Sequence, residues 1–251
     1  VEKRFANELA LLEKVIDFKD SPYARKNGIS TFRNGDTKLV LEVGKEANWS
    51  GTISAAHTAN DALIMQYYEE PTNTKAAFGK KLSDKQWKQI GELNFYTGNL
   101  AMMGTHALGV VTAHPLLECM NAELANDNRR FTFLCGHDTN ITGVLGALRV
   151  EDYTLPGVID PRTPIGVKVV IEKWHGADGE DYAAVNLLYP DTAQIRSLTP
   201  MTLENPPRVY RLSLKGLQAN ADGLYLFSDV EKRFAEAIAE YDEFAEERQA
   251  A

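Results

Sequence analysis

The sequence predicts an α/β protein with a mainly helical first half and a second half that carries most of the strands. In the first 126 residues, apolar side chains recur mainly at helical spacing. After Arg130, runs rich in aromatic and β-branched residues appear instead. One of these runs, residues 131–135, leads through Gly136 into a helical pattern that ends near Leu148. This strand–turn–helix order is typical of an α/β sheet.

The first half shows four helical patterns with recognisable starts and ends. The capping box Ser83-x-x-Gln86 opens one of them, and Ser50 precedes another that Pro71 closes. Pro115 marks a kink or a break in the last. The predicted helices are 2–18, 51–70, 83–96 and 99–124, with a polar loop at 20–34 and a short strand at 37–43.

The second half reads as strands followed by one long helix. Two strands flank the polar loop 175–181, which is suited to an antiparallel hairpin. Ser228 or Asp229 is expected to cap the final helix, which runs to about residue 247. The predicted strands are 131–135, 166–174, 182–189, 193–198 and 208–214.

Composition narrows the functional class. The content of 44% hydrophobic and 25% charged residues is ordinary for a soluble globular protein. A net charge of −8 argues against nucleic acid or an anionic membrane as the partner, although an anionic substrate needs only a local positive site. No apolar run approaches the roughly 18–20 residues that cross a bilayer. The chain begins at Val1 without a signal-peptide pattern, so we expect a mature or trimmed product.

The cysteines and histidines predict neither a metal site nor a disulfide framework. Cys135 is expected to pack as a small hydrophobic residue in a buried strand, although a single bridge to Cys119 stays open. No Cys-x-x-Cys and no histidine pair at i, i+4 exists, so no metal or other cofactor is expected.

The predicted position of His137 and Asp138 makes them candidate functional residues. They follow a strand and begin a helix that Thr139 or Asn140 can cap. Ligands bind at this edge of open α/β sheets, and helix N-termini favour anions. The pair could therefore hold a phosphate and supply a proton. The alternative is purely structural: His137 ends the strand, and Asp138 is only a helix cap.

The run Gly136-His-Asp-Thr-Asn140 resembles the histidine acid phosphatases, in the branch that contains bacterial glucose-1-phosphatase and periplasmic phytase. The likeness extends in order over nearly the whole chain. The further segments that resemble this branch are 9–18, 49–56, 114–117, 155–157, 163–174 and 200–214.

The resemblance implies a histidine-phosphatase-like (phosphoglycerate-mutase-like) sheet with helices on both faces, incomplete in this chain, plus a mainly helical cap domain. Residues 1–20 would be a helix of the α/β core, and residues 21–125 would form the cap. Residues 126–251 would be the C-terminal half of the core.

The resemblance also implies an acid phosphatase that hydrolyses phosphomonoesters through a phosphohistidine, without a metal. Its nucleophile lies in an Arg-His-Gly-x-Arg-x-Pro motif, but none of the twelve arginines here precedes a histidine. What carries over is half a site: Asp138 as general acid, His137 as phosphate ligand, and Thr139 and Asp61 as substrate-binding residues. The chain alone is therefore expected to be inactive or nearly so.

The expected partners follow from this half site. We expect the missing N-terminal half to be a second chain or a removed segment, or this chain to self-associate over its exposed sheet edges. The resemblance implies phytate or a sugar phosphate as substrate and a periplasmic or secreted location. The alternative from another class is a non-catalytic phosphoryl-ligand-binding protein. A third alternative is a helical-plus-β structural domain that matches by ancestry only.

Overall fold

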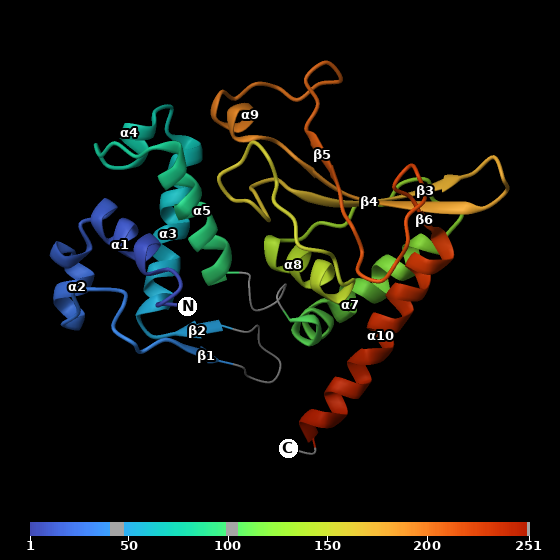
Figure 1. Ribbon diagram of the computed structural model, residues 1–251, viewed down its shortest axis with the longest axis horizontal. Coiled ribbons are helices and arrows are strands. Elements are labelled where there is room, and N and C mark those ends of the chain that lie inside the picture. The colour runs from blue at the N-terminus through green and yellow to red at the C-terminus, as the bar shows by residue number, and fades with distance from the viewer. Residues whose placement is uncertain (41–47, 99–104, 250–251) are drawn as a thin grey trace. The chain divides into compact units, whose positions relative to one another are not determined.

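The computed structural model describes residues 1–40, 48–98 and 105–249, which form two compact units (Figure 1). The helical unit comprises Val1–Leu100, Thr154–Ile165 and Pro190–Pro207. The sheet unit comprises Ala101–Tyr153, Gly166–Tyr189 and Arg208–Ala251. Each unit is described by itself.

The helical unit packs its longer helices around one apolar core. Helix α1 packs against α3 and α5, and the amphipathic spacing that predicted these helices is what buries their apolar faces. The fully buried side chains include Trp87 and Leu93 of α5 and Leu12 of α1. The elements are α1 (Ala6–Val15), η1 (Phe18–Asp20), α2 (Pro22–Asn27), β1 (Lys38–Val40), β2 (Asn48–Ser50), α3 (Thr52–Glu69), α4 (Asn73–Ala76), α5 (Asp84–Gly98) and α9 (Thr192–Arg196).

The start of α5 confirms the predicted capping box, whereas the start of α3 differs from the prediction. At α5, the Ser83 N–H donates to Gln86 Oε1 (2.9 Å) and the Gln86 N–H donates to Ser83 Oγ (3.3 Å). At α3, the cap comes from a distant residue, because Asp36 Oδ1 accepts from the Thr52 N–H at 2.9 Å. Ser50, the predicted cap, lies in β2 instead.

Two short helices replace predicted loop and strand. Helix α2 lies within the predicted loop, because the Ser21 side chain accepts from the Ala24 N–H and Pro22 occupies the first helical position. Helix α9 lies where a strand was predicted over residues 193–198. There Asp191 and Gln194 form a capping box, and that local signal outweighs the strand-like composition.

The predicted strand 37–43 is found in part. Strand β1 runs antiparallel to β2 with Leu39 opposite Trp49. The remaining residues of the predicted strand, 41–43, lie outside the described residues.

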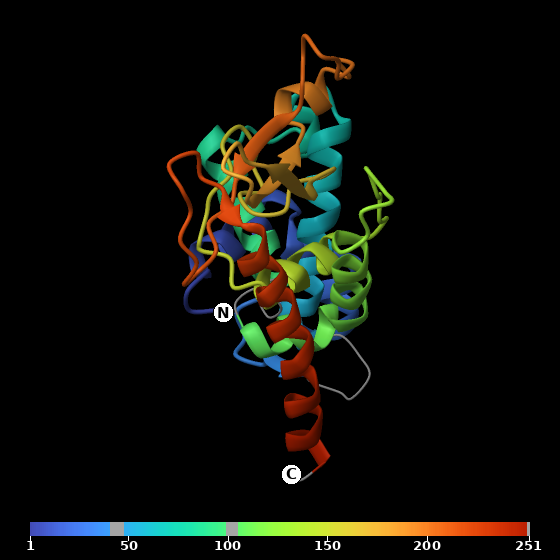
Figure 2. The same ribbon diagram turned by 90° about the vertical axis from the view of Figure 1, so that its right-hand side faces the viewer.

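In its described residues, the sheet unit joins an antiparallel sheet to three helices. Its elements are α7 (His106–Leu124), α8 (Asp138–Ala147), β3 (Lys168–His175), β4 (Asp181–Tyr189), β5 (Arg208–Arg211), β6 (Tyr225–Leu226) and α10 (Phe227–Gln249). The strand order is β3-β4-β5, and β6 also pairs with β4. Trp174 lies opposite Tyr182 in the register, so the predicted hairpin is confirmed. Helix α7 packs against both α8 and α10 (Figure 2) and continues through Pro115.

The prediction of a buried strand at residues 131–135 is wrong for this chain. The segment is an extended coil between α7 and α8 that pairs with no described strand (Figure 2). Its large side chains are exposed: Phe131 is 82% exposed, Phe133 64% and Leu134 41%. The local composition is that of a strand, but a strand also needs a neighbour to satisfy its backbone groups.

The boundaries of the compact units differ from the predicted domain division. The first helix, α1, packs within the helical unit, and α7 belongs to the sheet unit although residues up to 125 were assigned to the cap. The predicted core and cap domains are those of a fold larger than this chain, so the predicted domain division stays a prediction. Among the described residues, no helix is long and apolar enough to span a bilayer.

Candidate functional site

His137 and Asp138 lie at the start of α8, as the sequence predicted. His137 is the N-cap residue with an extended backbone, and Asp138 is the first residue of the helix. The Asn140 and Ile141 N–H groups donate to the His137 carbonyl at 3.1 and 3.2 Å, which fixes the first turn. Both side chains of the pair are exposed to solvent. The amino end of the α8 dipole therefore coincides with an imidazole and a carboxylate.

Asn140 holds this turn from inside the helix, a role that was not predicted in this form. Its Oδ1 accepts from the His137 backbone N–H at 2.8 Å. A Cβ on Gly136 would lie only 2.9 Å from that oxygen, so the close approach favours glycine there. The predicted caps, Thr139 or Asn140, are thus replaced by His137, with Asn140 supplying the reciprocal contact. The spacing of three residues between His137 and Asn140 was the available signal.

Asp138 and Thr139 share a contact within the same turn. Asp138 Oδ1 accepts from the Thr139 backbone N–H at 2.9 Å. Thr139 is half-buried, and its carbonyl accepts from the hydroxyl of the fully buried Thr142 at 3.0 Å. The structure therefore brings three of the predicted site residues, His137, Asp138 and Thr139, onto one helical turn.

Close packing against α7 positions α8. A Cβ on Gly109 of α7 would lie 2.8 Å from the Ala147 nitrogen, and a Cβ on Gly143 would lie 3.3 Å from that of Ala113. Small residues four apart on both helices let the two backbones approach closely. The orientation of the first turn of α8 is therefore set by a rigid helix pair.

Asp61, the fourth predicted site residue, belongs to the helical unit. It is exposed on α3, and its Oδ1 accepts from Asn94 Nδ2 of α5 at 3.4 Å. One turn earlier on α3, His57 Nδ1 lies 3.1 Å from Thr97 Oγ1, again between α3 and α5. Asn94 was not predicted as a partner of Asp61, because contacts between helices far apart in sequence leave no local signal.

The two cysteines are free thiols, and both are exposed. The expectation that Cys135 is packed is wrong for this chain, for the same reason that its segment is exposed. Over residues 1–40, 48–98 and 105–249, no three His, Cys, Asp or Glu side chains are grouped so as to hold a metal ion.

Solved structures define the class of fold to which this arrangement corresponds. The chain has the fold of the histidine acid phosphatases represented by phytases. Hafnia alvei phytase, solved without ligand and in complex with myo-inositol hexakis sulphate, matches with a TM-score of 0.80 and 25% identity. The match covers 94% of this chain and 60% of that one.

Particular relatives by sequence are phosphatases. The glucose-1-phosphatase of Providencia rettgeri is 29% identical over 233 residues, which cover 90% of this chain and 55% of that protein. Phytase AppA of Escherichia coli is 38% identical over 233 residues, which cover 85% of this chain and 52% of that protein. The chain thus spans about half the length of the curated relatives it matches. No protein-family model matches the sequence.

Proposed function

We propose that this chain is part of an acid phosphatase that hydrolyses phosphomonoesters through a phosphohistidine. The observation that carries the proposal is the exposed His137–Asp138 pair on the first turn of α8, in a chain with the fold of phytases. Relatives named glucose-1-phosphatase and phytase support the reaction class. No metal or other cofactor takes part in this proposal.

In this proposal His137 binds the phosphoryl group and Asp138 acts as general acid. At acidic pH, a protonated imidazole donates charge-assisted hydrogen bonds to phosphoryl oxygens. The amino end of α8 adds a favourable field for the anion. An alkoxide is a poor leaving group, so protonation of its oxygen by Asp138 contributes about 10²–10⁴ in rate.

Thr139 and Asp61 complete the proposed set as substrate-binding residues. Thr139 lies one residue beyond the acid, where its hydroxyl can contact the phosphate. Asp61 is assigned by its resemblance to an acidic residue of the family, and its contact with Asn94 holds the carboxylate on the exposed side of α3. Phytate and sugar phosphates are the proposed substrates. A periplasmic or secreted location accompanies the family assignment.

In this proposal the attacking histidine comes from outside these 251 residues, since the family motif places it after an arginine and no Arg-His pair occurs in them. Two observations support a complementary part. The chain spans about half of its curated relatives, and residues 131–135 expose a strand-like run that a neighbouring strand would cover. We propose a second chain or a further segment of the same protein as that part. Self-association of this chain is the remaining way to cover the run.

The test uses the chain together with its proposed complementary part, assayed near pH 4–5 with two substrates. Asp138→Asn should lower kcat by about 10²–10⁴ on an alkyl phosphate and by less on p-nitrophenyl phosphate, whose leaving group needs less protonation. Asp222→Asn, on an exposed loop of the same unit, is the matched control and should leave both rates unchanged. Undiminished turnover of the alkyl phosphate by Asp138→Asn would remove the general-acid assignment.

The alternative of a non-catalytic phosphoryl-ligand-binding protein rests on the absence of an Arg-His pair from this sequence. It predicts that phosphate esters bind in a His137-dependent manner and are never hydrolysed. An Arg-His-Gly segment encoded in frame upstream of Val1 would favour the enzyme. Trapping of a phosphohistidine on that segment would exclude the non-catalytic binding protein and favour the enzyme.

A further inference from the structure

The backbone of His137 is held on both sides of its Cα atom by the first turn of α8. On one side, the His137 N–H donates to Asn140 Oδ1 at 2.8 Å. On the other side, the His137 carbonyl accepts from the Asn140 and Ile141 N–H groups at 3.1 and 3.2 Å. Rotation about the two backbone bonds of this residue (φ −116°, ψ 175°) is therefore restrained from both ends. Because the two flanking peptide groups fix the direction of Cβ, the imidazole leaves the backbone in one direction relative to α8.

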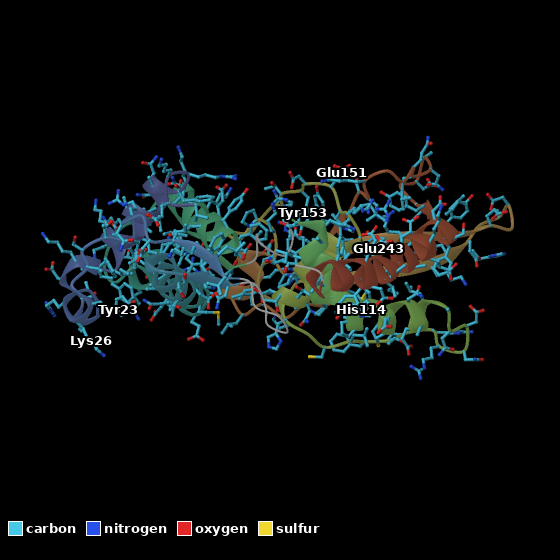
Figure 3. The ribbon with its side chains drawn as sticks, turned by 90° about the horizontal axis from the view of Figure 1, so that it is seen from below. Tyr23, Lys26, His114, Glu151, Tyr153 and Glu243 are labelled. Atoms are coloured by element: carbon cyan, nitrogen blue, oxygen red, sulfur yellow. The ribbon has the colours of Figure 1, made fainter. Side chains whose placement is uncertain are left out.

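Helix α8 gives this turn a rigid base. Its residues 142–147 are buried, and the close approach of Gly143 to Ala113 sets the distance between α8 and α7. Helix α7 is in turn held against α10, where His114 stacks on Tyr241 with ring centroids 4.0 Å apart (His114 is labelled in Figure 3). A side chain that is fixed relative to α8 is therefore also fixed relative to the packed part of the sheet unit.

The segment before His137 gives no comparable support. Residues 131–135 pair with no described strand, and their side chains are exposed. Gly136, which joins this segment to the helix, has no side chain that restricts its backbone. Without the bond to Asn140, the His137 N–H would face solvent, and His137 would follow the extended segment rather than the helix. Asn140 thus stands at the boundary between an unpaired segment and a packed helix.

Gly136 leaves the space that the Asn140 amide occupies. A Cβ built on Gly136 would lie 2.9 Å from Asn140 Oδ1 and 3.4 Å from the Asn140 Cβ. The φ angle of Gly136 lies outside the left-handed region, so the backbone itself would accept alanine. The need for glycine therefore comes from the acceptor oxygen of Asn140 and not from a turn. A larger residue at position 136 should act through Asn140.

We propose that Asn140 is a positioning residue that ties the His137 imidazole to α8 and so sets it beside Asp138 on one turn. Asp138 is the first residue of the helix and takes its direction from α8 directly, so only His137 needs the additional bond. The pair is thereby arranged in advance, although the segment 131–135 has no strand partner in this chain. The benefit for phosphate binding rests on the proposed function, whereas the coupling of His137 to α8 does not.

An amide suits this position better than a carboxylate if the turn binds an anion. Both groups offer an oxygen that accepts the His137 N–H, and an acidic residue in the first turn also stabilises a helix. A carboxylate, however, would add a second negative charge next to Asp138, where His137 is proposed to bind a phosphoryl group. Asn140 supplies the acceptor without the charge, so the amino end of α8 keeps its attraction for an anion. Helix stability alone favours an acidic residue, whereas anion binding favours asparagine.

The test of positioning uses the 251-residue chain and the NMR coupling between the amide and α protons of His137, which reports φ. In the wild type this coupling should have the value of one fixed, extended φ. Asn140→Ala should move it toward the average of a mobile residue and should speed exchange of the His137 amide about tenfold, the equivalent of one ordinary hydrogen bond. Asn140→Asp keeps the acceptor and should restore both. An unchanged coupling in Asn140→Ala would overturn the proposal.

A double-mutant cycle with Gly136→Ala tests the contact behind this effect. Alone, Gly136→Ala should disturb the His137 coupling in the same sense, because the new Cβ displaces the Asn140 oxygen. Added to Asn140→Ala it should have no further effect, since the oxygen is gone and the remaining 3.4 Å to Cβ is an ordinary contact. Additive effects would overturn the assigned contact between Gly136 and Asn140.

Inorganic phosphate is the probe for the role of the neutral acceptor. At pH 6, the amide signals of residues 138–141 should shift as phosphate is added to the wild-type chain. Asn140→Asp should weaken this binding about three- to tenfold, the effect of one added charge close to an anion in an exposed site. Its unfolding midpoint should equal or exceed that of the wild type, because an acidic residue suits the first turn of a helix. A residue that only stabilised the helix would not separate the two measurements.

Asn128→Asp is the matched control, because it adds the same charge at an exposed turn of the same unit and should keep the wild-type affinity. Equal affinities for the wild type and Asn140→Asp would overturn the role of the neutral acceptor. A wild-type chain that binds no phosphate would overturn that role together with the assignment of His137 as phosphate ligand. The coupling of His137 to α8 is measured without phosphate and without turnover. Failure of the positioning role and failure of the proposed function are therefore separate results.

Discussion

Large apolar side chains are buried in the helical unit but exposed in residues 131–135 of the sheet unit. In the helical unit, Trp87, Leu93 and Phe32 are less than 2% exposed. In the segment 131–135, Phe131 and Phe133 are 82% and 64% exposed. Both sequences are rich in apolar residues, so composition does not separate them. The difference is that α1, α3 and α5 find their partners within this chain, whereas no described strand pairs with the segment.

This contrast identifies the segment at which the proposed complementary part would bind. Full burial of a Phe or Leu side chain contributes about 1.5–3 kcal/mol relative to exposure. The helical unit already has that contribution from its core. The segment would gain it for several residues at once if a neighbouring strand covered it, and that gain would hold the proposed complementary part in place.

The same substitution in the two regions gives the largest expected difference. Leu93→Ala removes a fully buried side chain and should lower the unfolding free energy of the chain by about 2–5 kcal/mol. Leu134→Ala, in the exposed segment, should change it by less than about 0.5 kcal/mol. Denaturant unfolding of the 251-residue chain measures both. Equal losses would mean that the segment is packed in solution and would break the comparison.

A smaller effect is expected from a close backbone contact inside the helical unit. A Cβ on Gly91 of α5 would lie 2.0 Å from the Ile159 carbonyl oxygen, in a loop of the same unit. Gly91→Ala should lower the free energy of unfolding by about 1–3 kcal/mol, because the backbones of α5 and of the loop at Ile159 have to move apart. Glu92→Ala, the exposed neighbour on α5, is the control and should have almost no effect on the unfolding midpoint.

Acid should weaken the helical unit at a carboxylate that fastens its N-terminal loop. Glu13 accepts from the Thr31 hydroxyl (2.6 Å), the Phe32 N–H (2.7 Å) and Arg33 Nη2 (2.8 Å). Burial opposes ionisation of this group, but these hydrogen bonds outweigh it, so the pKa of Glu13 lies below its ordinary value. The ionised carboxylate therefore stabilises the folded chain at pH values above the ordinary pKa of glutamate, about 4.3. This stabilisation is lost as the pH falls through the lowered pKa of Glu13.

Glu13→Gln should therefore cost about 1–2 kcal/mol at pH 7 and less at pH 3, because below the ordinary pKa of a glutamate the unfolded chain binds a proton there more readily than the folded wild type does. Unfolding curves at the two pH values measure the difference. Glu69→Gln on the exposed side of α3 is the control. If the loss of unfolding free energy in Glu13→Gln did not change with pH, it would come from the altered shape of the side chain and not from the lost negative charge.

The helices were predictable because their signals are local. The box Ser83-x-x-Gln86 and the spacing of buried residues in α1 and α3 lie within single segments. Strand pairing is not local: the hairpin β3–β4 was found through its short loop, whereas residues 131–135 carry the composition of a strand without a neighbour. The candidate site follows the same division. His137 and Asp138 were placed correctly at the start of α8, but the contact of Asp61 with Asn94 joins residues 33 positions apart and left no trace in either segment.

The smallest effect on the chain itself is expected for Phe133→Ser, and it sharpens the comparison most. Phe133 is already 64% exposed, so the variant should change the unfolding free energy of the 251-residue chain by less than about 0.5 kcal/mol. In the presence of the proposed complementary part, which would cover the segment, the same change should cost about 3–5 kcal/mol, because there it opens a core. Ser54→Ala on α3, unrelated to the segment, should behave alike in both contexts. A Phe133→Ser cost that is small with and without the complementary part would mean that nothing covers this segment, and the proposed source of the attacking histidine would lose its structural support.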